Sequence, residues 1–160
     1  NNRLADNGLK YRAINASISG DTSAGGLYRL APLLREYQPE LVIIELGGND
    51  GLRGYPIDQL RANLQQMTEL SIAQGAQVLL LQMEIPPNLG PRYTRLFRES
   101  FAWVADQTGA HWAPFILEDI AVNSALMQSD GIHPTAAAQP LIVENVWPSL
   151  AALLERSDAQ

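Results

Sequence analysis

The sequence predicts an α/β fold, a three-layer α/β/α sandwich in which helices cover both faces of a parallel sheet. Short apolar segments alternate with longer segments of helical periodicity along the chain. Two of the apolar segments, 41–46 and 77–83, lack polar alternation, which is typical of parallel strands buried on both faces. Polar clusters follow the predicted strands, at the sheet edge where α/β proteins form their sites.

The N-terminal part of the chain is predicted to hold the end of a helix, a strand and a second helix. Residues 1–12 resemble the second half of an amphipathic helix. Residues 11–17 form a short strand candidate that ends in small polar residues. Apolar residues at helical spacing predict a helix over 27–37, which Pro39 ends.

The rest of the chain continues the same alternation. Pro56 or Asp58 is expected to begin a helix that runs towards Gly75, and Pro134 suits the first turn of the last helix. The other predicted elements, in chain order, are a strand at 41–46, a loop at 47–56, a strand at 77–83, a proline-rich loop at 84–91, a helix at 93–109, a short strand at 110–115, a short helix or irregular segment at 116–128 and a final helix at 135–157.

The composition bounds the class of protein. A chain of 160 residues is enough for one domain, and we expect residues 1–160 to form a single domain. The formal net charge of -6 and the scattered arginines argue against a nucleic-acid partner. The absence of cysteine excludes disulfides, thiolate chemistry and cysteine-type zinc sites. No apolar run is long enough to span a bilayer, so we expect no membrane span.

The motif Gly-Gly-Asn-Asp follows the predicted strand at 41–46. Gly47 and Gly48 allow the backbone to turn sharply off that strand. Asn49 could then present its side-chain amide, a neutral donor suited to an oxyanion that develops during a reaction. The alternative is an ordinary turn, because glycine, asparagine and aspartate are common turn residues.

The segment Ser-Gly-Asp-Thr-Ser at 19–23 follows the first strand candidate. Gly20 could offer a backbone N–H to the same space as the asparagine amide. Asp21, Thr22 or Ser23 could instead cap the helix that follows.

The pentapeptide Asp-Gly-Ile-His-Pro at 130–134 places an acid three residues before a histidine. The carboxylate of Asp130 can hold the His133 ring in one tautomer and stabilise its imidazolium, the role of the acid in a serine triad. Alternatively, Asp130 only caps or turns the backbone, and His133 is a surface residue near the start of a helix. The second histidine, His111, lies in a predicted strand beside Trp112, where a structural role is favoured.

A divalent metal ion offers another interpretation of these polar residues. The side chains that could converge on such an ion are those of Asp21, Asp50, Asp130 and His133. No two of them share a helix face at metal-ligand spacing, and an amide flanked by glycines suits an anion better. We therefore do not predict a metal site.

Taken together, the segments 15–23, 42–54 and 130–134 resemble the SGNH (GDSL) hydrolase superfamily over essentially the whole chain. Within it they are similar to the bacterial thioesterase I, lysophospholipase and arylesterase branch. The resemblance implies a flavodoxin-like parallel sheet and a serine esterase in lipid metabolism, periplasmic or secreted. It implies small-molecule substrates, carboxylic esters or thioesters including acyl-CoA, aryl esters and lysophospholipids, and no cofactor.

The resemblance also implies roles for individual residues. The backbone N–H of Gly20 and the side-chain amide of Asn49 would line the oxyanion hole. Asp130 and His133 would be the acid and the base of the triad. The loop at 86–93 would border the acyl-binding pocket, with its expected contacts at Ile85, Leu89 and Tyr93.

The nucleophilic serine of the family lies in a Gly-Asp-Ser block after the first strand, and that tripeptide does not occur here. Ser17, Ser19 and Ser23 belong to the second block of the resemblance and are not its equivalents. We expect an N-terminally incomplete domain whose serine lies upstream of Asn1, so that this chain alone is inactive.

The family's first strand is central, between the segments 11–17 and 41–46. Without it, both neighbours would expose unpaired backbone groups, each of which costs about 1–3 kcal/mol when buried. We therefore expect an N-terminal segment, an altered sheet, or a strand that another chain supplies through exchange or oligomerisation.

The competing hypothesis is a catalytically inactive binding or interaction protein that kept the SGNH scaffold and lost the nucleophile. A nucleotide-binding α/β domain has less support, because no glycine loop that could cradle a phosphate leads into a helix.

Overall fold

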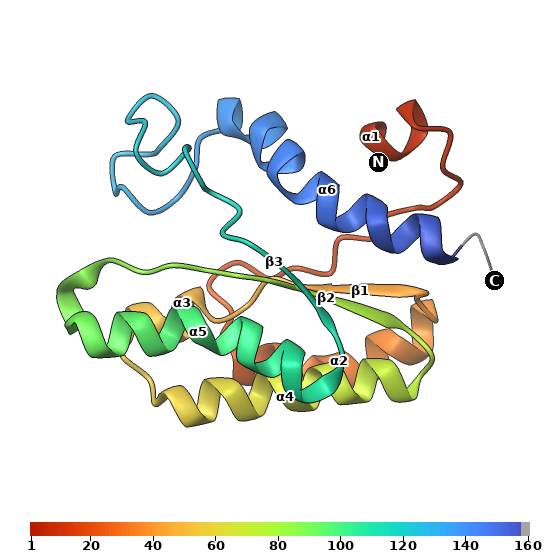
Figure 1. The fold of residues 1–160 in the computed structure, drawn as a ribbon, viewed down its shortest axis with the longest axis horizontal. Coiled ribbons are helices and arrows are strands. Elements are labelled where there is room, and N and C mark those ends of the chain that lie inside the picture. Colours follow the sequence, from red (N-terminus) through yellow and green to blue (C-terminus); the bar gives the residue numbers. More distant parts are fainter. Residues whose placement is uncertain (158–160) are drawn as a thin grey trace.

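The computed structural model describes residues 1–157, with the side chains of residues 1–155 (Figure 1). In chain order, its elements are α1 (Asn2–Asp6), α2 (Ser23–Tyr37), β1 (Leu41–Ile44), α3 (Gly48–Leu52), α4 (Ile57–Ala73), β2 (Gln77–Leu81), η1 (Pro87–Leu89), α5 (Pro91–Thr108), β3 (His111–Ala113), η2 (Ala136–Ala138) and α6 (Gln139–Ser157). None of these helices has the length and apolar character that crossing a membrane requires.

The three strands form one parallel sheet in the order β1–β2–β3. Leu41 of β1 lies opposite Gln77 of β2, and Leu79 of β2 lies opposite His111 of β3. The predicted parallel α/β fold is confirmed. The strands are shorter than the apolar runs that predicted them, because each ends where its pairing with a neighbour ends.

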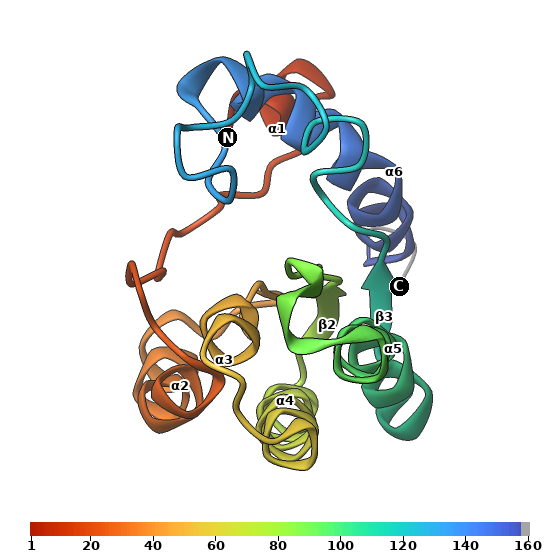
Figure 2. The same cartoon turned by 90° about the vertical axis from the view of Figure 1, so that its left-hand side faces the viewer.

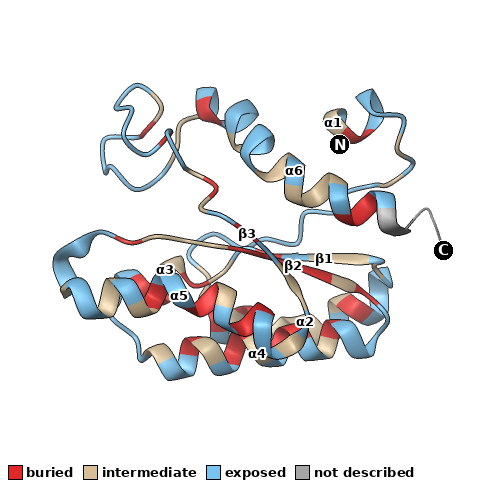
Figure 3. Cartoon of the chain, viewed as in Figure 1, coloured by how far each residue is buried: buried red, intermediate tan, exposed pale blue. Residues whose placement is uncertain are grey.

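Helices lie on both sides of the sheet, as the sandwich requires (Figure 1, Figure 2). α2, α4 and α5 lie on one side, and α6 with α1 lies on the other. β2 is buried on both faces: Val78 and Leu80 pack among α4 and α5 side chains, whereas Leu79 and Leu81 face α6. Figure 3 shows the buried segments along β2 and on the sides of α4 and α5 that face the sheet.

Helix ends follow local sequence signals. Thr22 caps α2, since its hydroxyl accepts a hydrogen bond from the Gly25 N–H at 3.3 Å. α5 ends at Gly109, whose φ of 73° is readily adopted only by glycine, as the sequence predicted. α4 begins at Ile57, directly after Pro56.

Residues 11–17 do not form the predicted strand. A strand is stabilised by hydrogen bonds to a neighbour, and the described sheet contains only β1, β2 and β3. Residues 11–17 instead line a cavity of about 560 Å³, whose other wall includes all of β1. The cavity lies between the segment and β1, so the two do not pair.

The walls of this cavity come from all three layers. α2 contributes Leu30 and Leu33 from one side of the sheet, and α6 contributes Leu150 and Leu154 from the other. The cavity therefore lies in the plane of the sheet, beside the edge of β1 that does not pair with β2.

Two further local predictions are wrong. The predicted loop at 47–56 contains a short helix, α3, because Gly47 adopts φ 115° and lets the chain turn directly into it. Pro134 is not in the first turn of the last helix: it forms an isolated bridge with Met127, and α6 begins at Gln139. Pro140 occupies the first turn instead, where its missing N–H costs nothing.

Candidate active site

The structure joins Asp130 and His133 in a loop that precedes α6. Asp130 Oδ2 lies 2.7 Å from His133 Nδ1, and Asp130 Oδ1 accepts the backbone N–H groups of Ile132 and His133 at 2.9 and 3.0 Å. Gly131 adopts φ 66°, which allows this tight turn. The contact to the imidazole, followed by those to the two backbone groups, lowers the pKa of the Asp130 carboxyl to about 2.

The pair is accessible from solvent. The side chain of His133 is 66% exposed, and its Nε2 has no hydrogen-bond partner among the described residues. The carboxylate on Nδ1 favours the tautomer with the proton on that nitrogen, so Nε2 presents its lone pair outward. This arrangement suits a base that takes a proton from a group outside the loop.

The two expected oxyanion donors lie in a turn and in a short helix. Gly20 adopts φ 77° in the turn before α2, and Asn49 is half-buried in α3. Within the described part of the chain, neither the Gly20 N–H nor the Asn49 carboxamide makes a hydrogen bond to another protein group. Both donors therefore remain available for a ligand.

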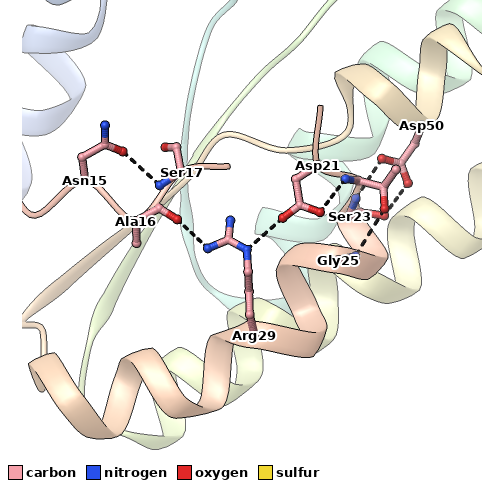
Figure 4. Close-up of polar contacts among 9 residues, drawn as sticks. Asn15, Ala16, Ser17, Asp21, Ser23, Gly25, Arg29 and Asp50 are labelled. Atoms are coloured by element: carbon pink, nitrogen blue, oxygen red, sulfur yellow. Dashed lines mark hydrogen bonds and ion pairs between the residues drawn. The ribbon is translucent and has the colours of Figure 1, made fainter. Parts of the chain in front are cut away.

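The acidic residues near these donors already have protein partners (Figure 4). Asp21 accepts the Arg29 Nε–H at 2.8 Å, and Asp50 accepts the hydroxyl of Ser23 at 2.5 Å. No group of three His, Asp or Glu side chains that could hold a metal ion occurs among residues 1–155. His111 is half-buried in β3, within the sheet.

The expected pocket residues differ in their surroundings. Ile85 is buried in the core with Phe97, while Leu89 is exposed on η1. Tyr93 donates its hydroxyl to the backbone carbonyl of Tyr55 at 2.6 Å. Burial, and secondly the charge of Asp50, raise the pKa of this hydroxyl. The contact of these side chains with an acyl group stays a prediction.

The expected site residues form two groups. The turn of Gly20 and the helix of Asn49 are connected by the contact between Ser23 and Asp50. Within the described residues, no hydrogen bond joins this group to the Asp130–His133 pair. The sequence interpretation missed the buried contact between Ser23 and Asp50. The available signal was Asn63, next to Leu64 in α4, because a polar side chain on a buried helix face requires a hydrogen-bond partner.

Comparison with known proteins places this chain in a family. Residues 1–140 match the GDSL-like Lipase/Acylhydrolase family. The chain therefore belongs to the GDSL-like lipases and acylhydrolases, and the predicted resemblance is confirmed.

Individual relatives agree with this assignment. The chain is 56% identical to Esterase TesA of Pseudomonas aeruginosa over 152 residues, which cover 95% of this chain and 76% of that protein. It is 43% identical to Thioesterase 1/protease 1/lysophospholipase L1 of Escherichia coli over 145 residues, which cover 91% of this chain and 70% of that protein. The crystal structure of the psychrotrophic esterase EstA from Pseudoalteromonas sp., inhibited by monoethylphosphonate, is similar with a TM-score of 0.92 at 44% identity, over 96% of this chain and 84% of that one.

Proposed function

We propose that this chain supplies the acid, the base and the oxyanion donors of a serine hydrolase that cleaves carboxylic esters or thioesters. The observation that carries the proposal is the 2.7 Å contact between Asp130 and His133 in a chain of this family. An exposed imidazole with a carboxylate on Nδ1 and a free Nε2 is prepared to deprotonate a serine hydroxyl.

In the proposed reaction, the serine oxygen attacks the carbonyl carbon while His133 Nε2 takes the hydroxyl proton. Asp130 stabilises the imidazolium that forms. The carbonyl oxygen gains the electron pair of the broken π bond, and the Gly20 N–H and the Asn49 amide stabilise that negative charge. The tetrahedral intermediate then expels the alcohol or thiol, which receives the proton from His133, and water hydrolyses the acyl-enzyme in the same way.

We place the serine outside residues 1–160, on a strand that adds to the free edge of β1. Ser23 is fully buried and bound to Asp50, and neither Ser17 nor Ser19 bonds His133 in the described structure. The cavity beside β1 supports the proposal, since it lies in the plane of the sheet with apolar walls from both flanking layers. The strand comes from a segment upstream of Asn1 or from another chain by strand exchange, and residues 1–160 alone would be inactive.

The names of the relatives support the substrate class. They include an esterase and a thioesterase that is also named a lysophospholipase. We propose small-molecule aryl and acyl esters, acyl thioesters and lysophospholipids as substrates, with the acyl chain against Ile85, Leu89 and Tyr93. The same proposal places the enzyme in lipid metabolism, in the periplasm or outside the cell.

The variant Asn49→Ala tests the proposal in the complete enzyme with 4-nitrophenyl butyrate as substrate. We expect a loss of about 100- to 1,000-fold in kcat, the usual effect of removing one oxyanion donor. The urea unfolding midpoint should not change, because the Asn49 side chain makes no hydrogen bond in the described structure. Asn7→Ala removes an exposed amide in the turn after α1 and should leave kcat unchanged.

Full activity of Asn49→Ala would contradict the assignment. A complete, folded protein that hydrolyses no ester and reacts with no fluorophosphonate would instead support a binding protein on the same scaffold.

A further inference from the structure

A buried polar network connects the loop of Gly20 to the loop of Asn49 (Figure 4). The Asp50 carboxylate accepts the Ser23 backbone N–H at 2.8 Å through one oxygen and the Ser23 hydroxyl at 2.5 Å through the other. Ser23 is 0% exposed and Asp50 is 3% exposed. Both carboxylate oxygens of Asp50 therefore accept hydrogen bonds from Ser23, which is distant in sequence.

A third side chain fixes the direction of this contact. Asn63 of α4, which is 5% exposed, donates its amide to the Ser23 hydroxyl oxygen at 2.9 Å. The hydroxyl oxygen accepts from Asn63, so its own proton points to Asp50. Gln59 donates to the Asn63 carbonyl oxygen at 2.9 Å and thereby fixes the orientation of the amide.

The network lies next to both expected oxyanion donors in sequence. Asp50 directly follows Asn49 in the first turn of α3, and Ser23 is the first residue of α2, three positions after Gly20. Asp50 also accepts an orphan N–H at the start of α2, as an N-cap residue does, although it belongs to α3. One buried contact therefore connects the start of α2, beside the turn of Gly20, to α3, which carries Asn49.

We infer that Ser23 and Asp50 are positioning residues that hold the Gly20 N–H and the Asn49 amide at the spacing that an oxyanion requires. The inference rests on the proposed function, because it assigns these two donors to the oxyanion. Donors that must converge on one atom lose most of their effect when they shift by about 1 Å.

The test uses the complete enzyme, with Ser23→Ala measured against a matched control. Ser71→Ala removes another fully buried hydroxyl, which donates to the Met67 carbonyl within α4 at 2.8 Å. At a temperature where both variants are folded by circular dichroism, Ser23→Ala should lower kcat about 10- to 100-fold with KM within about twofold. Ser71→Ala should leave both parameters within about twofold.

A double-mutant cycle separates positioning from a general loss of stability. If Ser23 acts through the oxyanion donors, Ser23→Ala should reduce kcat much less in the Asn49→Ala background than in the parent enzyme. Equal effects in both backgrounds, or a loss no larger than that of Ser71→Ala, would overturn the inference. If Ser23→Ala does not fold, Asp50→Asn, which keeps the side-chain size, replaces it with the same expected pattern.

The proposed function and this inference fail in different ways. Full activity of Asn49→Ala refutes the oxyanion assignment itself. Loss of activity in Asn49→Ala together with an unaffected Ser23→Ala refutes only the positioning role.

Discussion

The two edges of β1 have opposite environments. One edge pairs with β2 along its whole length, and the facing β2 residues Val78 to Leu80 are almost fully buried. The other edge borders the cavity of about 560 Å³, and Ile43 there remains 44% exposed. The comparison indicates that the paired edge stabilises residues 1–157, whereas the free edge can accept a further strand.

Truncation of a side chain in β2 should therefore cost much more stability than truncation of an exposed side chain in β1. This is the largest effect that we expect. Leu80→Ala removes a fully buried side chain and should cost about 2–5 kcal/mol of unfolding free energy. Ile43→Ala should cost less than about 1 kcal/mol in residues 1–160, because nearly half of that side chain already contacts water. Urea unfolding of both variants measures the difference, and equal costs would contradict the difference in burial between the two side chains.

Amide hydrogen exchange should show the same contrast within the backbone. In a parallel sheet, alternate residues of a strand direct their N–H groups to opposite neighbours. We expect the β1 amides that point into the cavity to exchange at least about 100-fold faster than those of β2. Uniform protection along β1, measured by NMR on residues 1–160, would show that its outer edge is already paired.

The sequence predicted the parts of the fold that depend on local patterns. The continuous apolar runs at β1 and β2 predicted buried parallel strands, and the spacing of Asp130 and His133 predicted their contact. It failed for residues 11–17, because a strand also depends on a neighbour that local composition does not reveal. It missed the Ser23–Asp50 contact for a similar reason, since those residues are 27 positions apart and lie on different helices.

The contact between Asp130 and His133, and the pKa that it gives to the acid, should not depend on whether either edge of β1 is paired. The Asp130 carboxyl should titrate at about 2, below its ordinary 3.8, with or without an added strand. Since its folded pKa is lowered, it contributes stability that is present above about pH 4 and is lost as the pH falls from there towards 2.

Removal of the ring tests the cause of this shift. His133→Ala should raise the Asp130 pKa, though not fully to 3.8, because the two backbone N–H groups still donate to the carboxylate. Carbon-detected NMR titration of both proteins measures the change. An unchanged pKa in the variant would show that the imidazole does not interact with the acid.

The central claim is that a serine from outside residues 1–160 completes the site at the free edge of β1. The most direct measurement is mass spectrometry of the fluorophosphonate adduct, on the complete protein and on residues 1–160 alone. The account predicts one modified serine outside these residues in the complete protein, dependent on His133, and no adduct on residues 1–160 alone. A His133-dependent adduct on Ser17, Ser19 or Ser23 would contradict it.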